Sequence, residues 1–175
     1  GVAEAILGRF AGGAAIPAST VIEITESLAT TQYARVLENL ARLRMNGFGI
    51  SIDDYGTGYS SVQQLSRIPF TELKLDKSFV SGAAAKPSMR AILESALQLA
   101  AKLRLKSVAE GIEREEEWLL LKSLGCDMAQ GYYISKPMPP DAFPQWYADW
   151  NGSLPQAIKA AAESASLRLG WHGAR

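Results

Sequence analysis

The sequence has one cysteine, one histidine and no long apolar run, and each scarcity removes a class of protein. Cys126 alone excludes an internal disulfide and favours a reducing compartment. With His172 as the only histidine, a Cys/His zinc cluster is excluded, and a Ser-His-Asp triad nearly so. No stretch reaches the ~20 apolar residues that cross a bilayer, and no signal-peptide pattern begins the sequence. We therefore expect a cytoplasmic protein, either alone or as the cytoplasmic part of a larger one.

Neither sign of charge dominates the sequence. Lys+Arg and Asp+Glu number 18 each among 175 residues, so no global field would attract polymeric nucleic acid or a membrane surface. An anionic ligand would have to be held by local charges or by a metal ion. Any intrinsic metal site must be built from oxygen ligands, which suit Mg²⁺, Mn²⁺ or Ca²⁺. The length predicts one domain with a sizeable core.

Short strands alternate with helices along the sequence. An apolar helical face through Val2, Ile6 and Phe10 precedes the first strand. The periodicities then predict strands at 21–25, 48–52, 72–75, 107–109 and 128–130, and helices at 31–45, 61–66, 91–103, 115–124 and 142–150. This alternation is typical of parallel βα units. The expected fold class is α/β and TIM-barrel-like, but incomplete, with about five of the eight strands of a closed barrel.

Each predicted strand ends in a polar residue. In a parallel barrel the carboxyl ends of the strands meet at one rim, where active sites form. We therefore predict that these residues converge on one site, although each alone has a simpler explanation, because strand ends are commonly polar. The residues are Glu23, Asp53 with Asp54, Lys74 with Asp76, Glu110 and Gln130.

Asp53 and Asp54 lie where the strand 48–52 is predicted to become a glycine-rich loop. Neighbours in a strand point to opposite faces, so only a turning backbone lets both serve one site. Two crowded carboxylates repel each other unless a cation or a proton lies between them. A metal site is therefore the leading interpretation, and a turn with solvated acids is the alternative.

The acidic rim residues suit hydrolysis of a phosphodiester. Glu23, Asp53, Asp54 and Glu110 offer enough carboxylates for one or two hard cations, and two such ions can activate a water and stabilise the leaving oxygen. Lys74 could orient that water or meet phosphate charge. Among acids it would stay protonated, which favours an electrostatic role over that of a general base. A simple salt-bridge lysine is the alternative.

Five motifs follow one another along the sequence. They are Ile22-Glu-Ile-Thr-Glu-Ser27, Ile52-Asp-Asp-Tyr-Gly-Thr-Gly-Tyr-Ser-Ser61, Leu73-Lys-Leu-Asp-Lys-Ser-Phe79, Val108-Ala-Glu-Gly-Ile-Glu113 and Gln130-Gly-Tyr-Tyr133. In this order they resemble the motifs of the EAL domain, a family of cyclic di-GMP phosphodiesterases of bacterial signalling. The resemblance runs from about residue 2 to residue 146. It implies a TIM-barrel-like fold that hydrolyses cyclic di-GMP to pGpG at a two-metal site holding Mg²⁺ or Mn²⁺. The Asp-Asp-Tyr-Gly-Thr-Gly sequence disfavours another carboxylate-metal barrel, such as an enolase type.

The resemblance also implies a role for individual residues. It makes Glu23 and Asp53 metal ligands, assigns Asp54 and Glu110 to the second metal, and places Lys74 against the catalytic water, so that Lys74 and Glu110 are the expected catalytic residues. The expected supporting residues are Glu26, which would position the loop, and Asp76, Glu113 and Gln130, which would lie at the rim near the substrate. Tyr55 stands where the family usually has phenylalanine, which adds a hydroxyl without removing a ligand.

The family's first third, which carries a Glu-Ala-Leu motif and an asparagine ligand, has no counterpart in the sequence. Glu4-Ala5-Ile6 looks like that motif, but it lies too close to Glu23 for two intervening βα units. We therefore expect a partial barrel over 1–150, followed by a C-terminal helix and tail over 151–175. An uncovered sheet edge favours association, so a homodimer is expected.

Two functions remain open at this point. The complete domain would be a phosphodiesterase, with this chain alone inactive and with sensory or GGDEF-type regulatory domains in the full-length protein. The alternative is a module that binds cyclic di-GMP or a protein partner without turnover.

Overall fold

The computed structural model describes residues 2–10, 17–25, 33–56 and 67–153. The chain divides into two compact units, Gly1–Ile134 and Ser135–Arg175, and the predicted division at residue 150 stays a prediction. The helix predicted at 61–66, the side chain of Asp54, Glu26, and most of the predicted C-terminal helix and tail lie outside the described residues. Within the described ranges, no helix is both long and apolar enough to cross a membrane.

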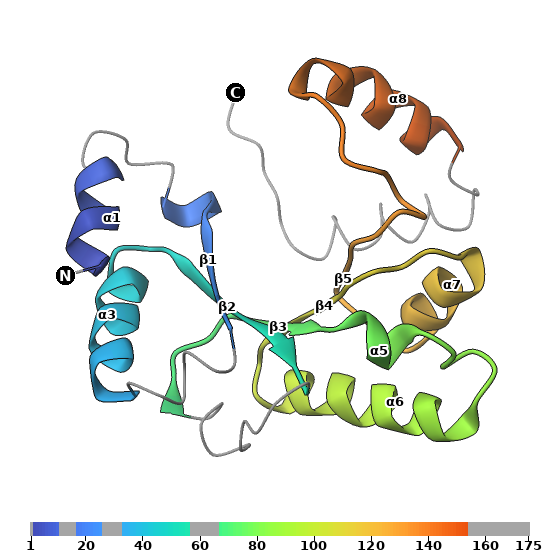
Figure 1. Cartoon of the computed structure of the whole chain (residues 1–175), viewed down its shortest axis with the longest axis horizontal. Coiled ribbons are helices and arrows are strands. Elements are labelled where there is room, and N and C mark those ends of the chain that lie inside the picture. Colours follow the sequence, from blue (N-terminus) through green and yellow to red (C-terminus); the bar gives the residue numbers. More distant parts are fainter. Residues whose placement is uncertain (1, 11–16, 26–32, 57–66, 154–175) are drawn as a thin grey trace. The chain divides into compact units, whose positions relative to one another are not determined.

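Five strands of the first unit form one parallel sheet whose order follows the sequence (Figure 1). This is the α/β fold that the alternation of strands and helices predicts, with the strand number of a partial barrel. The strands are β1 (Val21–Thr25), β2 (Gly49–Tyr55), β3 (Glu72–Leu75), β4 (Lys106–Ala109) and β5 (Met128–Ala129).

Helices connect the strands and cover the sheet. In the first unit α1 packs against α3, which contacts β2, and α6 packs against β3 and β4 (Figure 1). The helices among the described residues of this unit are α1 (Val2–Phe10), η1 (Pro17–Ser19), α3 (Tyr33–Met45), α5 (Lys77–Val80), α6 (Pro87–Lys102) and α7 (Glu115–Ser123). The second unit contains η2 (Pro140–Ala142) and α8 (Phe143–Ser153).

The prediction that the second strand ends at Ile52 was wrong. Strand β2 continues through Asp53 and Asp54 to Tyr55, which pairs with Leu75 of β3. The register between the two strands shifts after Ile52, so that two residues of β2 face one residue of β3, as in a β-bulge. Acidic residues followed by glycine suggest a loop, but pairing with β3 keeps this segment in the sheet.

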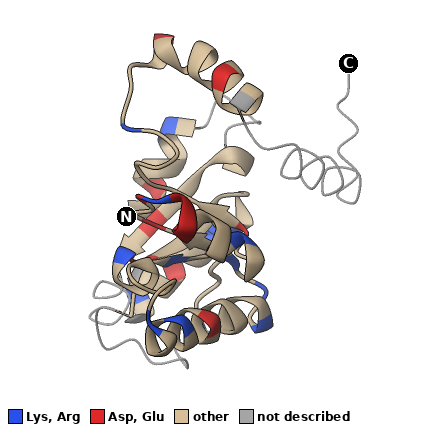
Figure 2. Ribbon diagram, turned by 90° about the vertical axis from the view of Figure 1, so that its right-hand side faces the viewer, with Lys and Arg blue, Asp and Glu red and all other residues tan. Residues whose placement is uncertain are grey.

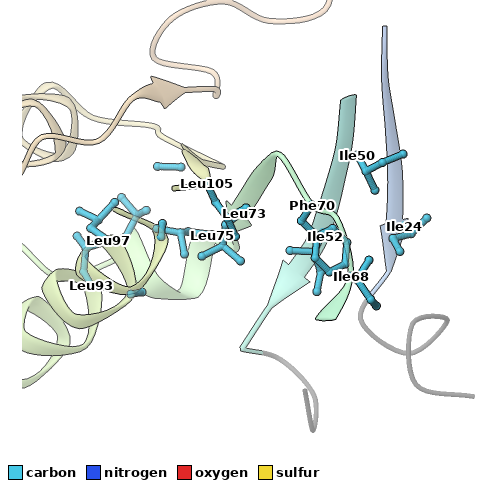
Figure 3. Packing of buried hydrophobic residues seen from close by; sticks show 14 of the residues in the cluster. Ile24, Ile50, Ile52, Ile68, Phe70, Leu73, Leu75, Leu93, Leu97 and Leu105 are labelled. Atoms are coloured by element: carbon cyan, nitrogen blue, oxygen red, sulfur yellow. The ribbon is translucent and has the colours of Figure 1, made fainter. Parts of the chain in front are cut away.

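The buried core lies on the face of the sheet that the helices cover. Ile24, Ile52 and Leu73 are register partners across β1, β2 and β3, and all three are buried. Figure 3 shows this row continuing past β3 to the α6 side chains Leu93 and Leu97. Since successive strand residues point to opposite faces, the intervening residues belong to the other face of the sheet.

Gly131 lets two backbone segments approach closely just after β5. A Cβ atom at this position would overlap the backbone N, Cα and O atoms of Ile112. The same segments are joined by hydrogen bonds from Ile112 N to Gln130 O (3.1 Å) and from Tyr133 N to Ile112 O (2.9 Å). The segment fixed in this way directly follows Glu110, at the end of β4.

We expect Gly131→Ala to destabilise the chain by about 2–3 kcal/mol, because backbone atoms cannot move aside as the end of a flexible side chain can. This corresponds to a fall in Tm of roughly 4–12 °C, measured by thermal unfolding. Gly8→Ala is the control, since a Cβ there meets nothing within 4 Å and alanine favours the helix α1. Equal Tm values for the two variants would contradict the prediction.

Candidate functional site

The ammonium group of Lys74 lies among three carboxylates at the carboxyl ends of the strands. Its Nζ atom is 2.7 Å from Glu110 Oε1, 2.9 Å from Asp53 Oδ1 and 3.0 Å from Glu23 Oε1. Lys74 is only 6% exposed. Strands β1, β2 and β3 and the residue that follows β4 therefore contribute to one cluster, which we call the Lys74 cluster: Lys74, Glu23, Asp53 and Glu110.

The strand register explains why these four residues meet. Lys74 is the third residue of β3 and points away from its buried neighbours Leu73 and Leu75. On one side of β3, the bulge in β2 sets Asp53 between the pairs Ile52–Leu73 and Tyr55–Leu75. On the other side, Glu110 N donates to Leu75 O (3.0 Å), which holds Glu110 beside the end of β3.

Asp54 sits in the same bulge, and its role stays a prediction because its side chain lies outside the described residues. The sequence required a turning backbone if Asp53 and Asp54 were to serve one site. The register shift after Ile52 is an irregularity of that kind. Glu26, the predicted loop-positioning residue, also lies outside the described residues.

Lys74 is held in its charged form. Burial alone would lower the pKa of Lys74, but the contacts with Glu110, Asp53 and Glu23 outweigh burial and raise this pKa above its usual value. Since the pKa is raised on folding, the contribution of the ion pairs to stability is complete below the unfolded pKa and is lost as pH rises through the folded one, above pH 10.5. A lysine that stays protonated up to at least pH 10.5 is a poor general base near neutral pH.

The oxygen atoms of the Lys74 cluster suit a hard divalent cation such as Mg²⁺ or Mn²⁺. Three carboxylates against one ammonium leave two formal negative charges uncompensated. Asp53 Oδ1 is buried, and the Lys74 ammonium lies 2.9 Å from it. Buried carboxylate oxygens are paired with a cation or coordinate a metal ion, so an oxygen in this setting also suits a metal ligand.

The described carboxylates do not yet stand at metal-binding distances. Within the described ranges, no three acidic, cysteine or histidine side chains lie close enough together to hold an ion as they stand. Their contacts with Nζ, at 2.7–3.0 Å, are hydrogen-bond lengths, whereas oxygen ligands lie ~2.0–2.1 Å from Mg²⁺. Each ligand would have to close in by roughly 0.6–1.0 Å around an ion in the place of the ammonium. The oxygen ligands therefore suit a divalent metal ion, but the distances between the carboxylates and Nζ are those of ion pairs with a lysine.

The remaining predicted rim residues make contacts outside the Lys74 cluster. Asp76 caps α5 by accepting a hydrogen bond from Ser78 N (2.9 Å), and Glu113 pairs with Lys77 Nζ (2.6 Å). Gln130 is exposed at the end of β5, where its backbone N donates to Ala109 O. Their predicted roles toward a substrate stay predictions.

Glu4 lies on α1, where it pairs with Arg42 of α3 at 3.0 Å. The sequence excluded Glu4 from the site by its spacing to Glu23, and this helix-to-helix ion pair gives Glu4 a structural use instead.

Glu117 is a positioning residue that the sequence did not single out. It is only 4% exposed, and its carboxylate accepts hydrogen bonds from the backbone N atoms of Glu113 (3.0 Å) and Arg114 (3.2 Å). Burial would raise the pKa of Glu117, but these bonds and the charge of Arg114 lower it below its usual value. The carboxylate thus fixes the segment between Glu110 and α7. A capping box, in which residue N3 bonds back to the start of the helix, is the signal that could have identified it.

Charge of neither sign covers a broad face of the ribbon. Figure 2 shows Lys and Arg residues interspersed with Asp and Glu residues along the helices and the strands, in agreement with their equal numbers. The electrostatic character of the candidate site is therefore local to the Lys74 cluster.

The chain is similar in sequence to known proteins. A family model described as the EAL domain matches residues 2–137. The chain is 42% identical over 127 residues to the cyclic di-GMP phosphodiesterase RocR of Pseudomonas aeruginosa, an alignment that covers 73% of this chain and 32% of RocR. The chain therefore spans about a third of the length of that relative.

Solved structures show the same fold. The PaMucR phosphodiesterase in complex with c-di-GMP superposes with a TM-score of 0.75 at 37% identity, over 82% of this chain and 58% of that chain. BlrP1 of Klebsiella pneumoniae, in a manganese/cy-diGMP complex, superposes with a TM-score of 0.65 at 34% identity, over 69% of this chain and 31% of that chain. The match to the family model over most of the sequence, together with these superpositions, shows that the chain belongs to the EAL domain family.

Proposed function

We propose that the EAL domain containing this chain hydrolyses cyclic di-GMP to pGpG with the help of divalent metal ions, in bacterial second-messenger signalling. The observation that carries the proposal is the convergence of Glu23, Asp53 and Glu110 on Lys74 at one end of a parallel sheet. The family membership supports the same reading, since the named relatives include phosphodiesterases and complexes with the cyclic dinucleotide.

Each residue of the Lys74 cluster has its own role in this proposal. Glu23 and Asp53 would hold one metal ion, and Glu110 together with Asp54 would hold a second. Bound ions of this type supply a water of lowered pKa and stabilise negative charge on the leaving oxygen. Lys74, charged and nearly buried, would orient that water and attract the phosphate. Mg²⁺ and Mn²⁺ are both consistent with the oxygen ligands, and the manganese complex of the BlrP1 relative supports Mn²⁺.

Asp76, Glu113 and Gln130 would lie around the substrate, and Glu26 would position the loop after β2. Asp76 already binds Ser78 of its own segment, and Glu113 binds Lys77 of α5, which follows β3. Their role would therefore be to hold the rim in place rather than to take part in the reaction.

The proposed partners follow from the same site. Cyclic di-GMP is the proposed ligand, and regulatory sensory or GGDEF-type domains are proposed for the full-length protein, located in the cytoplasm. Self-association as a homodimer is supported by two aromatic side chains of α8, since Phe143 is 50% and Tyr147 is 54% exposed.

A module that binds cyclic di-GMP or a protein partner without turnover is the second candidate. It is favoured by the Lys74 ammonium, which already neutralises part of the carboxylate charge, and by the lack of a ready metal-holding group in the described ranges. A binder would retain affinity for the dinucleotide but would release no product.

One experiment separates the two candidates. An EAL domain that contains this chain together with the family's Glu-Ala-Leu segment is incubated with cyclic di-GMP and Mn²⁺, and the products are separated while binding is measured in parallel. The phosphodiesterase predicts pGpG, and chelation with EDTA should stop its formation. Binding without product under saturating Mn²⁺ would favour the binding module.

A further inference from the structure

The Lys74 ammonium lies among the carboxylates that are proposed as metal ligands. It is 2.7–3.0 Å from one oxygen of each of three carboxylates, and these three include both described residues proposed as ligands of the first ion. The side chain of Lys74 is 8% exposed, those of Glu110 and Asp53 are 18% and 25% exposed, and that of Glu23 is 54% exposed. Water therefore screens the contacts of Lys74 with Glu110 and Asp53 less than its contact with Glu23.

The sheet fixes the backbone of Lys74, from which the side chain reaches the carboxylates. Its neighbours Leu73 and Leu75 are fully buried on the opposite face of the sheet, and β3 is paired on both sides, with β2 and with β4. The Cα of Lys74 is thus fixed, whereas its four-carbon side chain can rotate and move its charge by several ångströms.

We propose that Lys74 is an internal counter-cation: it holds the carboxylates of Glu23, Asp53 and Glu110 together in the metal-free chain, and a divalent cation has to displace its ammonium in order to bind. This inference deepens the proposed function and rests on it, because it concerns the same metal site.

The reason is electrostatic. Without Lys74 the three carboxylates would repel one another at close range, most strongly Asp53 and Glu110, which are the less exposed. A divalent ion between the same oxygens would stand beside the ammonium, and like charges at such a distance repel strongly in a poorly solvated site. Metal binding therefore includes the work of moving the ammonium away, and the affinity measured for the metal is lower than the carboxylates alone would give.

The opposite relation is also physically possible. If Lys74 mainly pre-organises the carboxylates, as second-sphere partners of metal ligands do, its loss would weaken metal binding. The two relations predict opposite changes in the Kd for the metal, so a measurement of that Kd decides between them.

The test uses the 175-residue chain and Mn²⁺ alone, without nucleotide. Lys74→Met keeps an unbranched apolar stem and removes the charge. We expect its Kd for Mn²⁺, measured by calorimetric titration into the millimolar range, to be at least tenfold lower than that of the wild type. In EDTA we expect a lower Tm for the variant, and the rise in Tm on addition of Mn²⁺ should be larger than in the wild type.

Three further variants make the result specific. Lys77→Met removes a lysine from an exposed ion pair with Glu113, outside the Lys74 cluster, and should leave the Kd within twofold of the wild type. Lys74→Arg keeps the positive charge and should not tighten Mn²⁺ binding. It shows whether the loss of charge, rather than the replacement of the lysine side chain, causes the effect of Lys74→Met. Asp53→Asn should abolish the binding that the wild type shows.

The outcomes separate this inference from the proposed function. If the wild type binds Mn²⁺ and Asp53→Asn does not, the proposed metal site stands. An equal or higher Kd for Lys74→Met then overturns the counter-cation alone. If Lys74→Met is unfolded in EDTA, its refolding on addition of Mn²⁺ supports the proposal, and failure to refold contradicts it. If neither the wild type nor any Lys74 variant binds Mn²⁺, both the metal site and the counter-cation are wrong for this chain.

Discussion

Asp53→Asn is expected to lower the hydrolysis of cyclic di-GMP by at least about 10³-fold in an EAL domain that contains this chain and the family's Glu-Ala-Leu segment. Asparagine keeps the shape of the side chain but removes its charge, and a hard cation depends on charged oxygen ligands. Asp53 Oδ1 is also buried beside the Lys74 ammonium, so the substitution removes a charge from the centre of the cluster.

The measurement is the turnover rate with Mn²⁺ raised until the rate no longer increases. Glu94→Gln is the matched control, since it also exchanges one acid for its amide, but on α6, where Glu94 pairs with Arg90 at the exposed helix surface. We expect the control to keep the rate of the parent domain. A near-normal rate for Asp53→Asn at saturating Mn²⁺ would mean that Asp53 is not a required ligand.

The sequence predicted that Glu23, Lys74 and Glu110 converge, because one simple rule governs their placement, while their roles in the site stay predictions. Lys74 and Glu110 stand near the carboxyl end of a strand, Glu23 is the third of the five residues of β1, and parallel strands bring such positions together. The order of the five strands, and hence the neighbours of each residue, follows from the alternation of strands and helices.

The end of β2 was not predictable in the same way. Asp53 and Asp54 are poor strand formers followed by glycine, and local propensity alone puts them in a loop. Pairing between Tyr55 and Leu75 overrides that propensity, and the bulge that results sets the position of Asp53. Such pairing depends on β3, about twenty residues further along the chain, and a local pattern does not contain it.

The contacts of charged residues were the least predictable feature. The sequence places an acidic run, Glu115 to Glu117, at the start of a helix, where all three would favour the helix dipole. Only Glu117 is buried and bonded to the preceding backbone. Likewise, helix α5 has only four residues, too few to show a period, although Asp76 before Ser78 is a capping signal.

The 175-residue chain alone is expected to hydrolyse cyclic di-GMP negligibly, below about 10⁻³ of the rate of the complete domain. The resemblance to the EAL family implies two further ligands, the glutamate of the Glu-Ala-Leu motif and an asparagine, that the printed sequence does not supply. A first metal ion would then keep only Glu23 and Asp53, and an ion held by two carboxylates remains mostly bound to water. In the described ranges, the spacing of the acids agrees with this, because no group is ready to hold an ion.

The assay follows pGpG production by the purified chain with Mn²⁺, beside the complete domain at equal concentration. Substantial turnover that chelation abolishes, and that Asp54→Ala also abolishes, would contradict the expectation. The missing ligands would then come from the chain itself or from a second copy. Glu4 is a poor internal candidate, because it is exposed on α1 and already pairs with Arg42. A rate that rises more steeply than the chain concentration would instead identify the second copy, since an incomplete parallel sheet exposes edges with which another chain can pair.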